Sequence, residues 1–202
     1  MESNPDRWFR RAFAPLWESA VEAMAAVVGA RAKDTVFVMN ATAAVNAVVN
    51  TLHLGPGTAC LVTNQTYEAC AHVVQNACEK SGATFIVMNL DRATLASYDA
   101  MAGKLVGTLR EHPTSTFALL DHITSPTAVL MPVKRLCSIC HEHGVAVMVD
   151  GAHAPGTVQA LAVPSYNADW YTGSTVFLSC CCVVWCILAF GAMLQMLHGP
   201  RR

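Results

Sequence analysis

Short apolar runs alternate with longer amphipathic stretches along most of the chain. Five runs have the length and the β-branched, apolar composition of strands buried on both faces: residues 35–40, 59–64, 84–90, 116–123 and 145–150. Helical periodicity fills the intervals at residues 41–52, 67–82, 93–112 and 132–144. Parallel strands need such crossover connections, so the pattern predicts an α/β fold. It has three layers, with helices on both faces of a mostly parallel sheet.

The two ends of the chain differ from this repeating pattern. Residues 1–34 predict a helical lead-in, and residues 35–174 predict the α/β domain. Residues 175–202 form a divergent apolar tail that is rich in cysteine and has no charge from Thr175 to Leu197. About 23 uncharged residues are enough to span a bilayer. Two interpretations stay open: a buried or aggregation-prone tail, and a membrane anchor at residues 175–197. Arg201 and Arg202 beyond the apolar run disfavour the anchor.

Charge and cysteine content narrow the classes of partner and compartment. The 202 residues carry a net charge of −1, so electrostatics give no reason to expect a nucleic-acid partner. The basic run Arg7–Arg11 is best explained as a solvated helix face. The first residues contain no apolar core of a secretory signal, which predicts a cytoplasmic protein whose nine cysteines are reduced thiols.

A short motif near the end of the domain has two interpretations, a haem or metal site and an ordinary helix. The stretch "CSICH", Cys137 to His141, has the C-x-x-C-H spacing of haem attachment, and His143 follows it closely. A zinc site needs a second pair of ligands, and the sequence has none at suitable spacing nearby. The favoured interpretation is a helix between two strands, and we expect no metal ligands in the chain.

Polar residues follow the predicted strands at the edge of the sheet where α/β proteins bind ligands. Taken singly, each has an ordinary structural explanation. Thr42 and Asp150 can cap helices, Tyr67 can be a half-buried ring, and His153 can be a satisfied polar residue. As an ordered set they supply a helix N-terminus that suits a phosphate, a flat ring, and a carboxylate at a strand tip. The set matches a phosphorylated aromatic heterocycle with a basic ring nitrogen.

Six motifs together resemble the class V aminotransferase family of pyridoxal-phosphate enzymes, which have fold type I. They are "ESNPDRWFRR", "VFVMNATAAVNAVV", "NQTYEAC", "LLDHITSPTAVLMPV", "VMVDGAHAPG" and "ADWYTGS". The chain is most similar to the isopenicillin N epimerase-like branch, which also resembles cysteine desulfurases and hercynylcysteine sulfoxide lyases. The resemblance runs from near residue 2 to Ser174. It implies pyridoxal 5′-phosphate as cofactor, an amino-acid substrate, lyase or epimerase chemistry, and a homodimer for the full-length parent.

The resemblance also implies roles for individual residues. The turn at Ala41 and Thr42 would hold the cofactor phosphate together with Ser174. Tyr67 would stack on the pyridine ring. For catalysis, Asp150 would bind the ring nitrogen and keep it protonated. His153 would donate to the phenolic oxygen of the ring, and Ser125 lies where relatives place an Asn for the same oxygen.

The family motif continues after "YTGS" with a His-Lys pair whose Lys forms the Schiff base. Aligned without gaps, the pair falls on Val176 and Phe177. The lysines of this chain all precede Asp150: Lys33, Lys80, Lys104 and Lys134. We therefore expect a truncated, catalytically impaired member of the family that binds the cofactor weakly and noncovalently. The alternative is a non-catalytic, membrane-associated product anchored by the tail.

Overall fold

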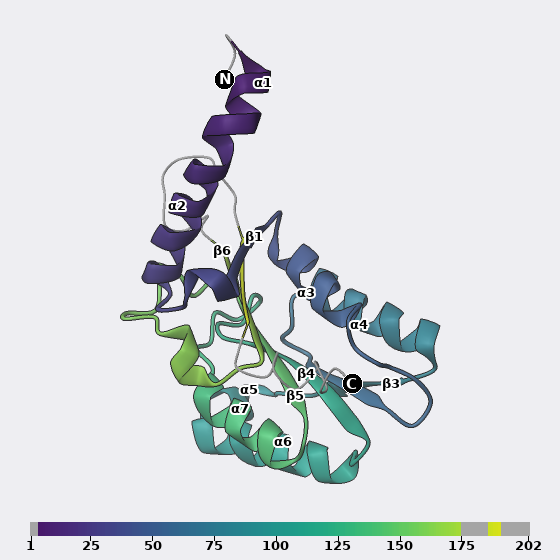
Figure 1. Cartoon of the computed structure of the whole chain (residues 1–202). Helices are drawn as coiled ribbons and strands as arrows, with labels where there is room; N and C mark the ends of the chain where they lie inside the picture. The colour runs from purple at the N-terminus through teal and green to yellow at the C-terminus, as the bar shows by residue number, and fades with distance from the viewer. Residues whose placement is uncertain (1–3, 175–185, 191–202) are drawn as a thin grey trace.

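The computed structural model describes residues 4–174 and the strand Cys186–Phe190. The strands form a seven-stranded sheet in the order β1-β7-β6-β5-β4-β2-β3 (Figure 1). Their bounds are β1 Thr35–Val38, β2 Ala59–Thr63, β3 Thr84–Met88, β4 Ser115–Asp121, β5 Ala146–Gly151, β6 Trp170–Ser174 and β7 Cys186–Phe190. All neighbours from β3 through β6 pair in parallel, and β7 runs antiparallel to both β6 and β1. The predicted mostly parallel α/β sheet is confirmed.

Helices cover both faces of this sheet (Figure 1). Their bounds are α1 Pro5–Arg7, α2 Phe13–Val27, α3 Ala41–Val49, α4 Glu68–Ser81, α5 Arg92–Leu95, α6 Tyr98–Glu111 and α7 Val133–Glu142. A π-helical segment, η1 Trp8–Ala12, joins α1 to α2, and two 3-10 turns, η2 Ala32–Asp34 and η3 Val163–Tyr166, complete the set. The N-terminal segment consists of α1, η1 and α2, and its first turns project beyond the sheet (Figure 1).

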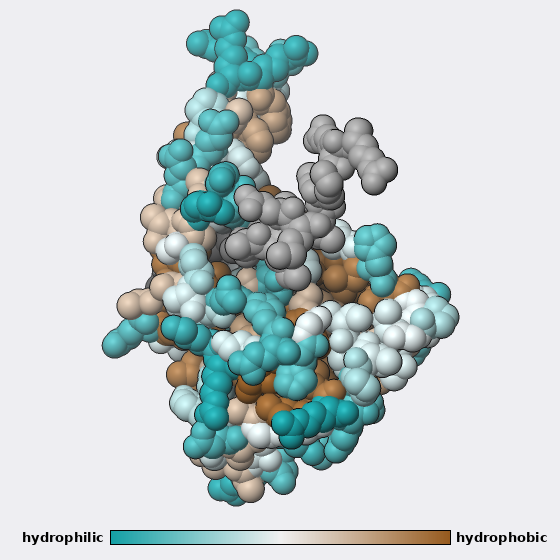
Figure 2. All heavy atoms as spheres, turned by 60° about the horizontal axis from the view of Figure 1, so that its bottom comes forward, coloured by the Kyte–Doolittle hydropathy of each residue, from teal (hydrophilic) through white to brown (hydrophobic). Residues whose placement is uncertain are grey.

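Two hydrophobic clusters hold the layers together, one on each face of the sheet. Alternate residues of β4 point to opposite sides, because side chains in a strand alternate. Phe117 and Leu119 pack in a cluster with residues of α3 and α4. Ala118 and Leu120 pack in the other cluster, with residues of α6 and α7. Seen from the side of α6 and α7, the surface mixes hydrophilic residues with smaller hydrophobic areas (Figure 2).

Two expectations from the hydrophobic pattern are wrong in detail. Strands β2, β4 and β5 are buried, but β1 and β3 are the edge strands of the sheet and are partly exposed. Val87 of β3 is half exposed, so an apolar run did not mean burial on both faces. The helix expected over 93–112 is two helices, because Ser97 has extended backbone and its side chain accepts a hydrogen bond from the Ala100 amide as N-cap of α6.

The end of the domain also differs from the sequence pattern. Residues 171–174, which the hydrophobic pattern did not identify as a strand, belong to the buried strand β6. Its Thr, Gly and Ser residues interrupt the apolar run that identified the other strands. The predicted tail 175–202 lies outside the described residues except for β7, which pairs between β1 and β6. Among the helices that the structure describes, none has the length and apolar character needed to cross a membrane.

The "CSICH" motif is part of α7, as the favoured interpretation predicted. Cys137 and Cys140 are buried in the core beneath the helix. The His141 ring contacts Asp169 at 3.0 Å from Nε2 to Oδ2, and Asp169 also accepts from the Val147 amide. The motif therefore ties α7 to the sheet. Within residues 4–174, no group of three metal-ligating side chains is assembled.

Candidate functional site

Three polar side chains form a row across the centre of the sheet at the carboxyl ends of its strands. Asp121 of β4 is in register with Asp150 of β5, and Asp150 is in register with Thr172 of β6. Residues in register on neighbouring parallel strands point to the same face. All three are buried, with 3%, 5% and 0% of their surfaces exposed. The row lies on the face covered by α3 and α4, because Cys70 of α4 contacts Asp150.

Asp150 is held by hydrogen bonds from two directions. The Ala152 amide donates to its Oδ1 at 3.0 Å, and the Cys70 thiol donates to its Oδ2 at 3.5 Å. Burial raises the pKa of Asp150, while these two donors and the nearby charge of His153 lower it. Burial is the largest of these effects, so the carboxyl needs a positive or donating group to be fully stabilised as an anion.

Asp121 lies beside Asp150 and anchors the start of α4. It accepts from the Thr66 hydroxyl at 3.1 Å and from the Tyr67 amide. Burial, followed by the charge of Asp150, raises the pKa of Asp121 to about 8, although both donors act in the opposite direction. Two buried carboxyls at facing positions disfavour a double negative charge. At neutral pH the pair therefore holds at least part of a proton.

The third member of the row has no hydrogen-bond partner. Thr172 Oγ1 is the one buried side-chain oxygen or nitrogen without a partner in the part of the chain that the structure describes. A buried hydroxyl without a hydrogen bond is unfavourable by about 1–3 kcal/mol. Its position beside Asp150 indicates that a polar ligand belongs at this edge of the sheet.

Helix α3 begins at the same edge. The Asn40 side chain caps it by accepting from the Ala43 amide at 2.7 Å. The amides of Ala41 and Thr42 precede that capped position, and helix geometry provides no intrahelical acceptor for them. Thr42 Oγ1 lies 3.7 Å from Cys70 Sγ. A helix start of this kind carries partial positive charge and suits an anion.

The remaining predicted residues differ in their burial and in their contacts with this row. Tyr67 is the N-cap of α4 and its side chain is half exposed, so the ring is accessible from solvent. His153 follows β5 and acts electrostatically on Asp150. Ser174 is the buried last residue of β6. Ser125 is exposed in the loop after β4, and no hydrogen bond within the described chain joins its side chain to the others.

The sequence interpretation assigned no role to three site residues: Asp121, Cys70 and Thr172. Asp121 had a usable signal, because it ends an apolar strand in the same way as Asp150 does. Thr172 had a weaker signal, because it lies in the same polar stretch as Ser174. Cys70 had none, because a cysteine in an amphipathic helix is typical of an ordinary buried position.

On the opposite face, an aromatic group supports the end of β5. The His122 ring contacts the Tyr171 hydroxyl at 2.8 Å from Nδ1, and the Tyr166 ring packs against both. Burial lowers the pKa of His122 to about 4, so its imidazole is neutral at physiological pH. Tyr171 lies directly over Gly151, where a Cβ atom would be 2.0 Å from its hydroxyl oxygen. Gly151 is therefore required for this close packing.

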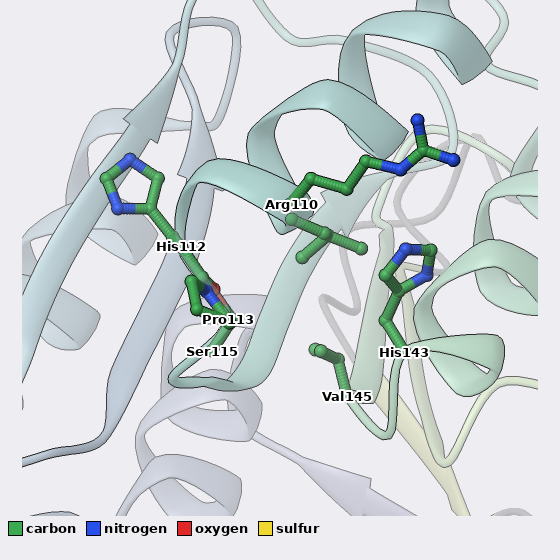
Figure 3. Close-up of a pocket in the computed structure, with 7 residues that line it drawn as sticks. Arg110, His112, Pro113, Ser115, His143 and Val145 are labelled. Carbon is green, nitrogen blue, oxygen red and sulfur yellow. The ribbon is translucent and has the colours of Figure 1, made fainter.

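A separate cavity lies at the amino-terminal end of the strands. It has a volume of about 330 Å³ and is lined by residues that include Arg110, His112, Ser115 and His143 (Figure 3). Ser115 begins β4 and Val145 precedes β5, so this cavity lies at the far edge from Asp150. In doubly wound sheets the ligand site is at the carboxyl edge. The row of Asp121, Asp150 and Thr172 is thus the candidate site.

Comparison with known proteins identifies the family of the chain. The profile of the aminotransferase class-V family matches residues 9–175, which is most of the chain. The chain belongs to the class-V aminotransferase family. The family match includes all the site residues described above, from Ala41 to Ser174.

Individual relatives are 30% identical to the chain over the residues that align. An isopenicillin N epimerase from Amycolatopsis lactamdurans is 30% identical over 176 residues, covering 86% of this chain and 44% of the relative. A putative L-cysteine desulfhydrase from Oryza sativa subsp. japonica is 30% identical over 185 residues, covering 85% and 38%. The chain thus spans less than half the length of these relatives.

Solved structures share the fold. A mutant of C-DES, with glycine covalently linked to its PLP cofactor, superposes with a TM-score of 0.83. The two chains are 21% identical, and the match covers 92% of this chain and 48% of that one. The family's fold type I, expected from the sequence motifs, is confirmed.

Proposed function

We propose that this chain binds pyridoxal 5′-phosphate at the carboxyl edge of the sheet, as the cofactor-binding part of an enzyme that acts on an amino acid. The observation that supports it most is the buried Asp150 carboxyl beside the unpartnered Thr172 hydroxyl. A buried carboxyl of raised pKa is stabilised as an anion by a protonated ring nitrogen. The family and the PLP-bound structural neighbour support the choice of ligand.

The remaining residues fit the other parts of the same molecule. The start of α3, at Ala41 and Thr42, would hold the phosphate with its first amides, together with Ser174. The half-exposed Tyr67 ring would lie against the pyridine ring. His153 would donate to the phenolic oxygen, and Ser125 is a weaker candidate for that oxygen because it is exposed on a loop.

Bound pyridoxal phosphate supplies an electron sink that stabilises negative charge at the α-carbon of an amino acid. The residues of this chain would keep the ring able to withdraw electrons. Asp150 holds a proton on the ring nitrogen, and the hydrophobic layer of α3 and α4 keeps water away from the carboxyl. Asp121 holds the Tyr67 amide and thereby the start of α4 beside the ring position.

The reaction class follows from relatives that are much longer than this chain. Those relatives are named as an epimerase and a desulfhydrase, so we propose lyase or epimerase chemistry on an amino acid for the complete protein. A cytoplasmic homodimer is part of the same proposal.

The proposal includes impaired catalysis by the chain as its sequence stands. Phe177 falls where the family motif has the Schiff-base lysine. The four lysines are all exposed and lie on η2, α4, α6 and α7. A phenylalanine offers neither the amine for covalent attachment nor the base that moves the α-proton. Cofactor binding would therefore be noncovalent and weak.

The test is a titration of the purified chain with pyridoxal phosphate, followed by borohydride reduction and peptide mapping. We expect saturable binding that Asp150→Asn weakens at least tenfold, with no stoichiometric adduct on one lysine. Asp99→Asn, an exposed carboxylate of α6, serves as the control and should bind as the parent does. Binding unaffected by Asp150→Asn would reject the site. A single stoichiometric lysine adduct with amino-acid turnover would reject the proposed impairment.

A further inference from the structure

The thiol of Cys70 lies between the two ends of the proposed cofactor site. Its sulfur is 3.5 Å from Asp150 Oδ2 and 3.7 Å from Thr42 Oγ1. Cys70 itself is fully buried in α4. Asp150 is the proposed partner of the ring nitrogen, and Thr42 belongs to the proposed phosphate-binding turn. One buried side chain thus connects the carboxyl at the strand tip with the first turn of α3.

The directions of the two hydrogen bonds follow from the chemistry of the groups. An ionised carboxylate only accepts, so the Cys70 S–H donates to Asp150. The sulfur can then accept from the Thr42 hydroxyl, which is consistent with Thr42 lowering the pKa of Cys70. Burial and the negative Asp150 raise the pKa of Cys70 to about 12, so the thiol keeps its proton at neutral pH.

We propose that Cys70 is a positioning residue that orients the Asp150 carboxylate and relays a hydrogen bond to it from Thr42. The Ala152 amide holds Oδ1 and the thiol holds Oδ2, so the plane of the carboxylate is defined by two donors. The thiol donor also favours the anionic form that a protonated ring nitrogen requires. The unpartnered Thr172 hydroxyl, in register with Asp150, independently indicates that a ligand completes this site. The functional role of Cys70 in this inference rests on the proposed function. The hydrogen bonds from Thr42 to Cys70 and from Cys70 to Asp150 are present in the protein without cofactor.

Other groups that face Asp150 also affect its ionisation. They are Asp121 from β4, Thr172 from β6 and His153 from the loop after β5. None of them is changed when Cys70 is substituted. A change in the ionisation of Asp150 is therefore assigned to the thiol.

The first experiment follows the ionisation of Asp150 without cofactor. The purified full chain carries a carbon-13 label on aspartate carboxyls, and the Asp150 resonance is assigned by its loss in Asp150→Asn. We expect Cys70→Val, which lacks a donor, to raise the titration midpoint of Asp150. Cys70→Ser, which keeps a donor, should leave the midpoint at or below that of the parent. Cys70→Ala serves as a second variant without a donor if valine does not fit.

The control is Cys78→Val, two turns along the same helix. Cys78 is equally buried and contacts Cys60 rather than Asp150. It should leave the Asp150 midpoint unchanged. An unchanged midpoint in both Cys70→Val and Cys70→Ala, or an equal shift in Cys78→Val, overturns the proposal.

The second experiment measures pyridoxal-phosphate affinity of the same variants. We expect Cys70→Val to bind about five-fold more weakly, the effect of one lost hydrogen bond of ordinary strength, and Cys70→Ser to bind as the parent does. An unchanged affinity in Cys70→Val shows that the relay does not serve the cofactor and overturns the positioning role. If the parent chain itself binds no pyridoxal phosphate, the proposed function fails, while the carboxyl titration still decides the relay.

Discussion

Asp121 and Asp150 occupy facing positions at the ends of two neighbouring parallel strands, and both carboxyls are buried. Both accept hydrogen bonds from α4 or from the residues just before it: Asp121 at the start of α4, and Asp150 from Cys70 within α4 and also from Ala152 after β5. The pair therefore joins the sheet to the helix that contributes Tyr67. Because burial raises the pKa of both carboxyls, the pair makes the free energy of unfolding fall as pH rises.

Asp121→Asn should reduce the loss of stability between pH 6.5 and 8. The pKa of Asp121 is about 8 in the folded protein and 3.8 in the reference state, so the folded chain binds more protons across this interval. The free energy of unfolding of the parent therefore falls as pH rises. The loss of stability that is due to Asp121 is complete once pH exceeds its pKa in the folded protein. Urea unfolding at several pH values measures the slope. The exposed Asp99→Asn is the control, and an equal slope in parent and Asp121→Asn contradicts the prediction.

His122→Gln should act in the acid range and with the opposite sign. The pKa of His122 is lowered from 6.5 to about 4, so the folded chain binds fewer protons between these values. Its contribution to stability is present above pH 6.5 and is lost as pH falls toward 4. The variant loses the hydrogen bond to Tyr171, so its free energy of unfolding should be about 1 kcal/mol lower at neutral pH. That free energy should also fall less steeply as the solution is acidified. The exposed His72→Gln of α4 should match the parent; a variant as acid-sensitive as the parent argues against a neutral, buried His122.

Gly151→Ala should destabilise the chain by about 3 kcal/mol, the upper end for overpacking in a core. Its new Cβ would lie 2.0 Å from the Tyr171 hydroxyl and 2.2 Å from the ring carbon that carries it. Gly103→Ala on α6 is the matched control, because nothing lies within 4 Å of its Cβ position. That control should be stabilised by up to about 1 kcal/mol through helix propensity. Thermal and urea unfolding compare the two, and similar stabilities would show that Tyr171 moves freely away from Gly151.

Thr172→Val should stabilise the cofactor-free chain by about 1 kcal/mol, because it removes a buried hydroxyl that has no partner. Thr124→Val is the contrasting change. Its equally buried hydroxyl contacts Thr127 at 2.8 Å and accepts from the Val129 amide at 2.8 Å, so its loss should destabilise by about 1–2 kcal/mol. Urea unfolding of both variants is the measurement. Destabilisation by Thr172→Val would show that the hydroxyl has a partner in the free protein.

Local pattern was sufficient for the units of this fold. Apolar runs of β-branched residues identified β2, β4 and β5, and helical periodicity with its end signals identified α3, α4 and α7. The positions just after those strands drew attention to Thr42, Tyr67 and Asp150. These features are readable in sequence because propensity, capping and hydrophobic period act over a few residues.

The order of the strands and the partners of each polar group depend on contacts between distant residues. Asp121, Asp150 and Thr172 form one row only because β4, β5 and β6 are neighbours in a particular register. Cys70 joins the site because α4 packs its buried side over the end of β5, 80 residues along the chain. The strand β6 is buried despite its polar composition because β5 and β7 pair with its two edges. The sequence by itself predicted most of the elements and the edge at which we propose the ligand binds. The tertiary structure decided which buried groups meet there, because register and packing arise only when the layers assemble.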